Sequence, residues 1–99
     1  MRTPMLLAAA LALSPLTAFP QDGARNLAAA CAICHGTQGK PPAGAPLIPL
    51  AGLPRDHIAS QMRAFRDGKR SATVMHQIAK GYNDAQIDAL AAWFAAQPR

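Results

Sequence analysis

Apolar residues recur at helical spacing in three stretches of the chain, and no run of alternating apolar residues indicates a sheet. The last stretch is the clearest, and its apolar stripe is formed by Ile87, Leu90, Ala91 and Phe94. Asn83 is suited to cap this helix, and Gln86 stands three residues later, as in a capping box. The pattern predicts a helix that begins at Asn83 and ends before Pro98.

The two earlier stretches also carry helix boundary signals. The first begins near Asp22, a suitable N-cap residue, and ends near Gly36. The second begins with Pro54 in its first turn and ends at Gly68. Its apolar side is formed by Ile58, Met62 and Phe65. We therefore expect an all-α protein.

A long segment between the first two helices, residues 36–53, is rich in glycine and proline and cannot form a regular element. It contains four aliphatic side chains that are too apolar to be left in water: Leu47, Ile48, Leu50 and Leu53. We expect this loop to wrap around something, with a mobile linker as the alternative.

The first 18 residues have the pattern of a secretory signal peptide, with Arg2 ahead of an apolar run from Met5 to Leu13. We expect cleavage near Ala18, which leaves residues 19–99 as the mature domain. The apolar run is shorter than the roughly 20 residues that cross a bilayer, so we expect no stable membrane insertion after cleavage. An uncleaved anchor is the alternative.

Length and composition limit what the mature chain can be. The sequence has 99 residues, which excludes a two-domain dinucleotide enzyme, a βα barrel and a solenoid of several repeats. Few large apolar side chains follow the leader, and a domain of this size usually needs a disulfide framework, a metal or a bulky prosthetic group. The formal net charge of +5 favours acidic partners but is too small to indicate nucleic acid.

The strongest motif is Cys31-Ala32-Ile33-Cys34-His35, which has the C-x-x-C-H spacing of haem attachment. On a helix the two thiols share a face, so both can reach the vinyl groups along one edge of a porphyrin. The imidazole of His35 can then bind the iron. This motif predicts thioether bonds from Cys31 and Cys34 and an axial ligand from His35.

Three other readings of the two cysteines remain open. A thioredoxin-like dithiol needs a helix N-terminus, whereas this pair sits at a helix end. A zinc site needs four ligands, and besides the motif only His57 or His76 is available. A plain disulfide between Cys31 and Cys34 leaves His35 and the small core unexplained.

The chain resembles the small class I cytochromes c, and within them the cytochrome subunit of flavocytochrome c sulfide dehydrogenase. The resemblance covers nearly all of the mature chain, and its motifs are C-A-I-C-H-G at residues 31–36, P-L-A-G at 49–52, Met75 followed by I-A-K-G-Y at 78–82, and A-L-A-A-W-F-A at 89–95. It implies a cytochrome c fold, in which three to five short helices wrap around one covalently bound haem c.

The resemblance also implies further roles at the haem. Met75 occupies the position of the second axial ligand of the iron, with His76 and then His57 as alternatives. A loop carbonyl orients the histidine ligand in this family, and here Pro46, Ile48 and Pro49 are the candidates. We expect the haem to be surrounded by Leu47, Ile48, Leu50, Ile58, Met62, Phe65, Val74 and Ile78.

The function implied is that of a one-electron carrier in the periplasm, which exchanges electrons with redox partner proteins and is not itself an enzyme. One alternative is the haem subunit of a flavoprotein complex, and another is a thiol oxidoreductase or metal-binding module. Basic residues could steer acidic partners, although a solvated helix face explains them equally; they are Lys40, Arg63, Arg66, Lys69, Arg70 and Lys80.

Overall fold

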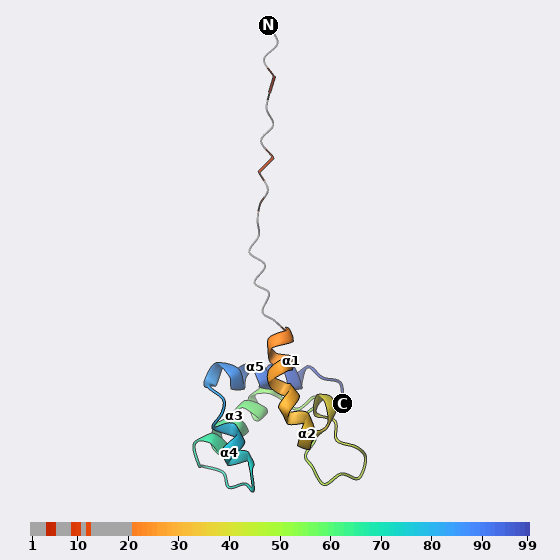
Figure 1. Ribbon diagram of the computed structural model, residues 1–99, viewed down its shortest axis with the longest axis vertical. Coiled ribbons are helices and arrows are strands. Elements are labelled where there is room, and N and C mark those ends of the chain that lie inside the picture. Colours follow the sequence, from red (N-terminus) through yellow and green to blue (C-terminus); the bar gives the residue numbers. More distant parts are fainter. Residues whose placement is uncertain (1–3, 6–8, 11, 13–20) are drawn as a thin grey trace.

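The structure is a computed structural model that describes residues 4–5, 9–10, 12 and 21–99 (Figure 1). The predicted leader, residues 1–18, lies largely outside them. The elements in chain order are α1 (Gln21–Ala28), the 3-10 turn η1 (Ala29–Cys31), α2 (Ala32–His35), the 3-10 turn η2 (Thr37–Gly39), α3 (Arg55–Arg66), α4 (Met75–Ala79) and α5 (Asp84–Ala95). No strand occurs among the described residues, and the prediction of an all-α protein with short helices is confirmed.

The core lies where α1, α3 and α5 meet, because α5 packs against both other helices. The predicted stripe of α5 faces this core, with Ile87 fully buried and Phe94 only 3% exposed. Ala28 of α1 and Ile58 of α3 complete the contact between the helices. Burial of this one stripe therefore fixes the relative positions of three helices.

Local signals set most helix ends as predicted. Asn83 caps α5: its side-chain oxygen accepts from the backbone N–H of Gln86 at 2.8 Å, and the Gln86 side chain accepts from the N–H of Asn83 at 2.9 Å. Two predictions were off by a residue. Pro54 is the N-cap of α3 instead of a first-turn residue. Helix α1 begins at Gln21, so Asp22 lies within the helix and not at its N-cap.

The first helical stretch ends at Gly36, as predicted. The backbone of Gly36 has φ 81°, and a Cβ atom there would lie 2.2 Å from the carbonyl oxygen of Lys40. Only glycine fits such a conformation and such a close approach. The chain therefore reverses immediately after His35 and brings the long loop back toward α2.

Ion pairs join α3 to the start of α5. Arg63 contacts Asp84 at 3.0 Å and Asp88 at 2.8 Å, and Arg66 contacts Asp84 at 2.8 Å and its neighbour Asp67 at 3.0 Å. Both arginines thus have carboxylate partners within the chain. Of the basic set expected to steer partners, Arg63 and Arg66 serve instead to hold two helices together.

Candidate haem site

The three residues of the motif stand together at the end of the first helical stretch. Cys31 ends the turn η1, and Cys34 and His35 close α2. At about 100° per residue, these three side chains fall on one arc of the helix surface. Both cysteines are free thiols; Cys31 is half-buried and Cys34 is exposed. The pair is therefore available for two bonds to one flat group that lies against this arc.

The imidazole of His35 is held by the loop that follows it. Its Nδ1 lies 2.8 Å from the carbonyl oxygen of Ile48. A carbonyl can only accept, so Nδ1 carries the proton and donates, which leaves Nε2 with a free lone pair for a metal. Of the three candidate carbonyls at residues 46, 48 and 49, the structure selects that of Ile48.

Hydrogen bonds at Gly39 close the base of the loop. The carbonyl oxygen of Gly39 accepts from the N–H of Leu50 at 2.9 Å and from that of Ala51 at 3.1 Å. Gly39 has φ 75°, and a Cβ atom there would lie 2.9 Å from Leu50, Ala51 and the ring of Phe94. The loop is thus anchored to the core at its base and to His35 near its end, which argues against a mobile linker.

Sequence reasoning did not single out Gly39. Its role depends on contacts with residues 50, 51 and 94, which are distant in the sequence. In the sequence Gly39 is marked only as a glycine in a turn-rich segment, and the other glycines of that segment cannot be distinguished from it.

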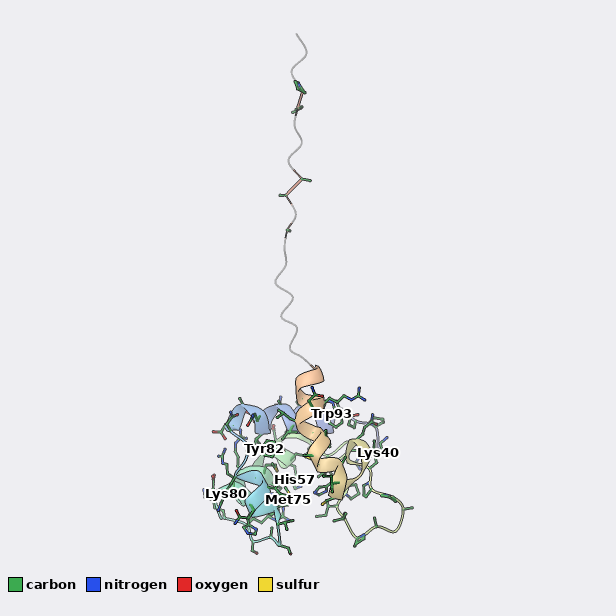
Figure 2. The ribbon with its side chains drawn as sticks, viewed as in Figure 1. Lys40, His57, Met75, Lys80, Tyr82 and Trp93 are labelled. Atoms are coloured by element: carbon green, nitrogen blue, oxygen red, sulfur yellow. The ribbon has the colours of Figure 1, made fainter. Side chains whose placement is uncertain are left out.

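Met75 lies on a different element from the motif. It is the first residue of α4, it is half-buried, and α4 packs against α3. Figure 1 shows α2 and the long loop on one side of the view and α4 on the other, and Figure 2 labels Met75. The methionine expected as the second ligand thus comes from a different element than the two cysteines and His35.

The two alternative ligands differ in their surroundings. His57 lies on the exposed surface of α3, and the hydroxyl of Ser60 donates to its carbonyl oxygen at 3.0 Å. His76 directly follows Met75 on α4, and its Nδ1 is buried without a hydrogen-bond partner among the described residues. A buried nitrogen of this kind indicates that the polypeptide alone does not complete this part of the molecule.

Four aliphatic side chains on the long loop and around Met75 are exposed in the polypeptide. Leu47 and Ile48 belong to the loop, and Val74 and Ile78 flank Met75. Their exposed fractions range from 41% for Leu47 to 59% for Ile48, whereas the stripe of α5 is almost fully covered. A large flat apolar group between α2 and α4 would bury part of this surface, and the two thiols and His35 have the chemistry to hold it. The residues therefore fit a haem.

Three expected haem neighbours also make contacts within the polypeptide. Ile58 is buried in the core between the helices, and Met62 packs against the same cluster. Phe65 lies under the guanidinium of Arg70, whose carbon is 4.7 Å from the ring centroid. These contacts place part of the expected set in the helical core.

The aromatic residues Trp93 and Tyr82 are both half-buried against the core. Trp93 meets Phe94 edge-on, with ring centroids 5.0 Å apart. This position agrees with the expectation that Trp93 packs with α5 against the first helix. Burial raises the pKa of Tyr82, and the nearby Cys31 raises it further.

The structure does not support the thiol or zinc interpretation. Among residues 21–99, no three His, Cys, Asp or Glu side chains are grouped so that they could hold a metal ion. Burial raises the pKa of Cys31. A dithiol oxidoreductase needs the opposite shift, because the thiolate is its nucleophile. The fold and the site together define the class of small all-α proteins that attach a haem through C-x-x-C-H.

Comparison with known proteins identifies the family within that class. The family model described as cytochrome c oxidase, cbb3-type, subunit III matches residues 18–94. The chain belongs to this family of cytochrome c domains.

Several curated relatives are similar to the chain. The thiosulfate dehydrogenase electron acceptor of Thiomonas intermedia is 46% identical over 70 residues, which cover 69% of this chain and 31% of that protein. The protein of the same name from Stutzerimonas stutzeri is 39% identical over 80 residues, covering 81% and 37%. The cytochrome subunit of sulfide dehydrogenase of Chlorobaculum tepidum is 34% identical over 87 residues, covering 88% and 74%.

The chain spans about a third of the length of the first two of these relatives. Family membership implies a covalently bound haem c with its iron, and the relatives are cytochromes and electron acceptors. The expected similarity to class I cytochromes c is thereby confirmed. Within the described residues, no helix has the length and apolar character needed to cross a membrane.

Proposed function

We propose that this protein is exported to the periplasm and carries one electron at a time between redox partner proteins. Residues 1–18 are the leader, and residues 19–99 form the mature cytochrome domain. The pattern of Arg2, the apolar run and Ala18 supports export, as does a family match that begins at residue 18.

In this proposal Cys31 and Cys34 form the two thioether bonds, and His35 and Met75 are the axial ligands of the iron. The observation that carries it is the hydrogen bond from His35 Nδ1 to Ile48, because it leaves Nε2 free for the metal. Figure 2 shows Met75 on the element across from α2. When bound, haem supplies an iron that cycles between the ferric and ferrous states.

The residues of the chain give this site the properties of a carrier. The Ile48 carbonyl fixes the orientation of the His35 ring and makes its nitrogen a better donor. A thioether sulfur from Met75 favours ferrous iron. If His35 and Met75 both bind the iron, they would leave no position for a substrate, and the site would be suited to electron transfer and not to the transformation of a bound molecule.

The mass and the absorption spectra of the mature protein test the attachment. Material from cells with a cytochrome c maturation system should carry the added mass of one haem and no free thiols. Its reduced spectrum should show the sharp bands of a low-spin c-type haem. A colourless protein with free thiols would contradict the proposal.

The Met75→Ala variant tests the sixth ligand. It should keep the covalent haem, lose the low-spin spectrum and bind carbon monoxide when reduced. Met62→Leu is the matched control, because Met62 packs against the core. If Met75→Ala has the spectrum and potential of the parent and His76→Ala does not, His76 is the ligand.

The haem subunit of a flavoprotein complex is a second candidate function. It is favoured by the similarity to the cytochrome subunit of sulfide dehydrogenase, which covers 88% of this chain and 74% of that protein. Copurification with a flavoprotein in a fixed ratio would support this function, whereas a monomer that reacts with its partners only in transient encounters would support a free carrier.

A further inference from the structure

Met75 stands at the less supported end of its helix. Helix α4 has only five residues, and no side chain caps its N-terminus at Val74. Its C-terminal end is better held, because Ala79 is fully buried and its carbonyl oxygen accepts from the N–H of Tyr82 at 3.2 Å. A helix of this length is at most marginally stable in isolation. Contacts outside α4 must therefore fix the position of Met75.

The segment that leads into Met75 has few backbone contacts. Residues 71–73, which the structure describes, neither donate nor accept a backbone hydrogen bond. The last such bonds before this stretch come from Lys69 and Arg70, whose N–H groups both donate to the carbonyl oxygen of Ala64 on α3, at 2.9 and 3.1 Å. Figure 1 shows the connection between α3 and α4 as a loop at the edge of the molecule. Arg70 is therefore the last anchored residue before the expected iron ligand.

The side chain of Arg70 adds two contacts with α3. The carbon of its guanidinium lies 4.7 Å from the centroid of the Phe65 ring. Its Nη1 group donates a hydrogen bond to Oε1 of Gln61. Gln61 and Phe65 are four residues apart and so share one face of α3. A planar guanidinium can lie on a ring and donate from its edge at the same time, and the two contacts together hold residue 70 against this face.

Arg70 differs in its contacts from the arginines that join α3 to α5. Arg63 and Arg66 both contact the carboxylate of Asp84. Arg70 has no ion pair among the described residues, and its side-chain contacts are with an aromatic ring and a neutral amide. Both of these groups belong to α3. The contacts of Arg70 therefore do not join two helices of the core, but fix the start of the segment that carries Met75.

We infer that Arg70 is a positioning residue for the sixth ligand: by holding the loop before Met75 against α3, it limits the fraction of molecules in which the methionine sulfur has left the iron. This inference rests on the proposed function, in which Met75 binds the iron. A molecule whose sulfur has left the iron can bind a small ligand from solution. The open fraction can therefore be measured through the affinity for such a ligand.

The test is a spectral titration of the ferric holoprotein with imidazole, which binds the iron where Met75 has left it. The apparent dissociation constant is the intrinsic constant divided by the open fraction. Arg70→Gln should bind imidazole about fivefold more tightly than the parent, which corresponds to about 1 kcal/mol for an exposed cation–π contact and its hydrogen bond. The weak red absorption band of ferric iron bonded to methionine sulfur reports the closed state before imidazole is added.

Two further variants identify the contacts responsible. Lys69→Gln is the matched control, because it removes the same charge one residue earlier and Lys69 has no ion pair among the described side chains. It should bind imidazole as the parent does. Gln61→Ala removes the acceptor of the Arg70 hydrogen bond and should increase the affinity by a smaller factor than Arg70→Gln. The double variant Gln61→Ala, Arg70→Gln should match Arg70→Gln alone, because the two residues act through one contact.

The outcomes separate this inference from the proposed function. If the parent shows the methionine band but Arg70→Gln binds imidazole as the parent does, Arg70 does not position the ligand, although Met75 remains one. The same holds if Lys69→Gln gains as much affinity as Arg70→Gln. Denaturant unfolding of each holoprotein adds a check, since a lower unfolding free energy with unchanged imidazole affinity would make the role of Arg70 structural only. If the parent lacks the methionine band, the proposed ligation by Met75 fails, and this inference fails with it.

Discussion

The side of the molecule built on α5 and the side that carries His35 and Met75 are stabilised in different ways. On the α5 side, apolar stripes face one another and each described carboxylate has an arginine partner. On the other side, aliphatic residues remain exposed and the Nδ1 of His76 has no partner. The first side is completed by polypeptide, and the second requires a prosthetic group as part of its interior.

The largest expected effect comes from removing the covalent attachment. The double variant Cys31→Ala, Cys34→Ala should lose the cooperative unfolding transition, because the side facing the haem has too little apolar burial of its own. Far-ultraviolet circular dichroism during thermal unfolding measures this. Cys34→Ala alone, which keeps one thioether bond, is the control. If the double variant lacks haem and still unfolds cooperatively, the side that carries His35 and Met75 does not need a prosthetic group for its stability.

Truncation in the α5 core should have the next largest effect. Phe94 is 3% exposed and its ring approaches Gly39 at the base of the loop. Phe94→Ala should lower the unfolding free energy of the holoprotein by about 3–5 kcal/mol, as large cavities do in cores. Denaturant unfolding followed by haem absorbance measures it.

Leu47→Ala is the matched truncation on the other side. Leu47 is 41% exposed in the polypeptide and the haem would cover only part of that surface, so its truncation should have a smaller effect than that of Phe94, about 1 kcal/mol. Equal effects for Phe94→Ala and Leu47→Ala would mean that the exposed loop contributes to the core of the holoprotein.

Sequence patterns predicted the features that depend on local signals. Periodicity identified the α5 stripe, the capping box identified Asn83, and the spacing of Cys31, Cys34 and His35 identified the attachment helix. Features that depend on side chains meeting across the chain were not predicted. Nothing local distinguished the Ile48 carbonyl from its neighbours, because the choice depends on how Gly39 anchors the loop.

The basic residues illustrate the same limit. Arg63 and Lys40 are both cations in the sequence, but Arg63 contacts Asp84 and Asp88 of the neighbouring helix, whereas Lys40 has no ion pair among the described residues. The packing of α3 against α5 therefore decides which cation forms an ion pair within the chain, and this packing cannot be read from the sequence pattern.

Loss of the α5 cap should have a smaller effect than core truncation. Asn83→Ala removes the oxygen that accepts from the N–H of Gln86. The unfolding free energy of the holoprotein should fall by about 1 kcal/mol. Asn83→Ser, which keeps an acceptor, should recover most of it, and the reduction potential should not change. A large change in potential would show that the α5 side and the haem side are not independent.

The smallest expected effect is that of the ion pairs between α3 and α5, because these groups are exposed to solvent. Arg66 and Arg63 hold the pKa of Asp84 below its ordinary value of 3.8. A carboxyl with a lowered pKa stabilises the folded state above that ordinary value, and the stabilisation is lost as the pH falls through the folded-state pKa. Asp84→Asn should therefore be slightly less stable than the parent at pH 7, and this difference in unfolding free energy should disappear in acid.

Urea unfolding of both holoproteins at neutral pH and near pH 3 measures the difference. Asp56→Asn is the control, because Asp56 also lies in the first turn of its helix but contacts only its neighbour Arg55, at 3.4 Å, so the comparison isolates the pairs between the two helices. A difference for Asp84→Asn that persists in acid would mean that the side chain contributes through packing and not through charge.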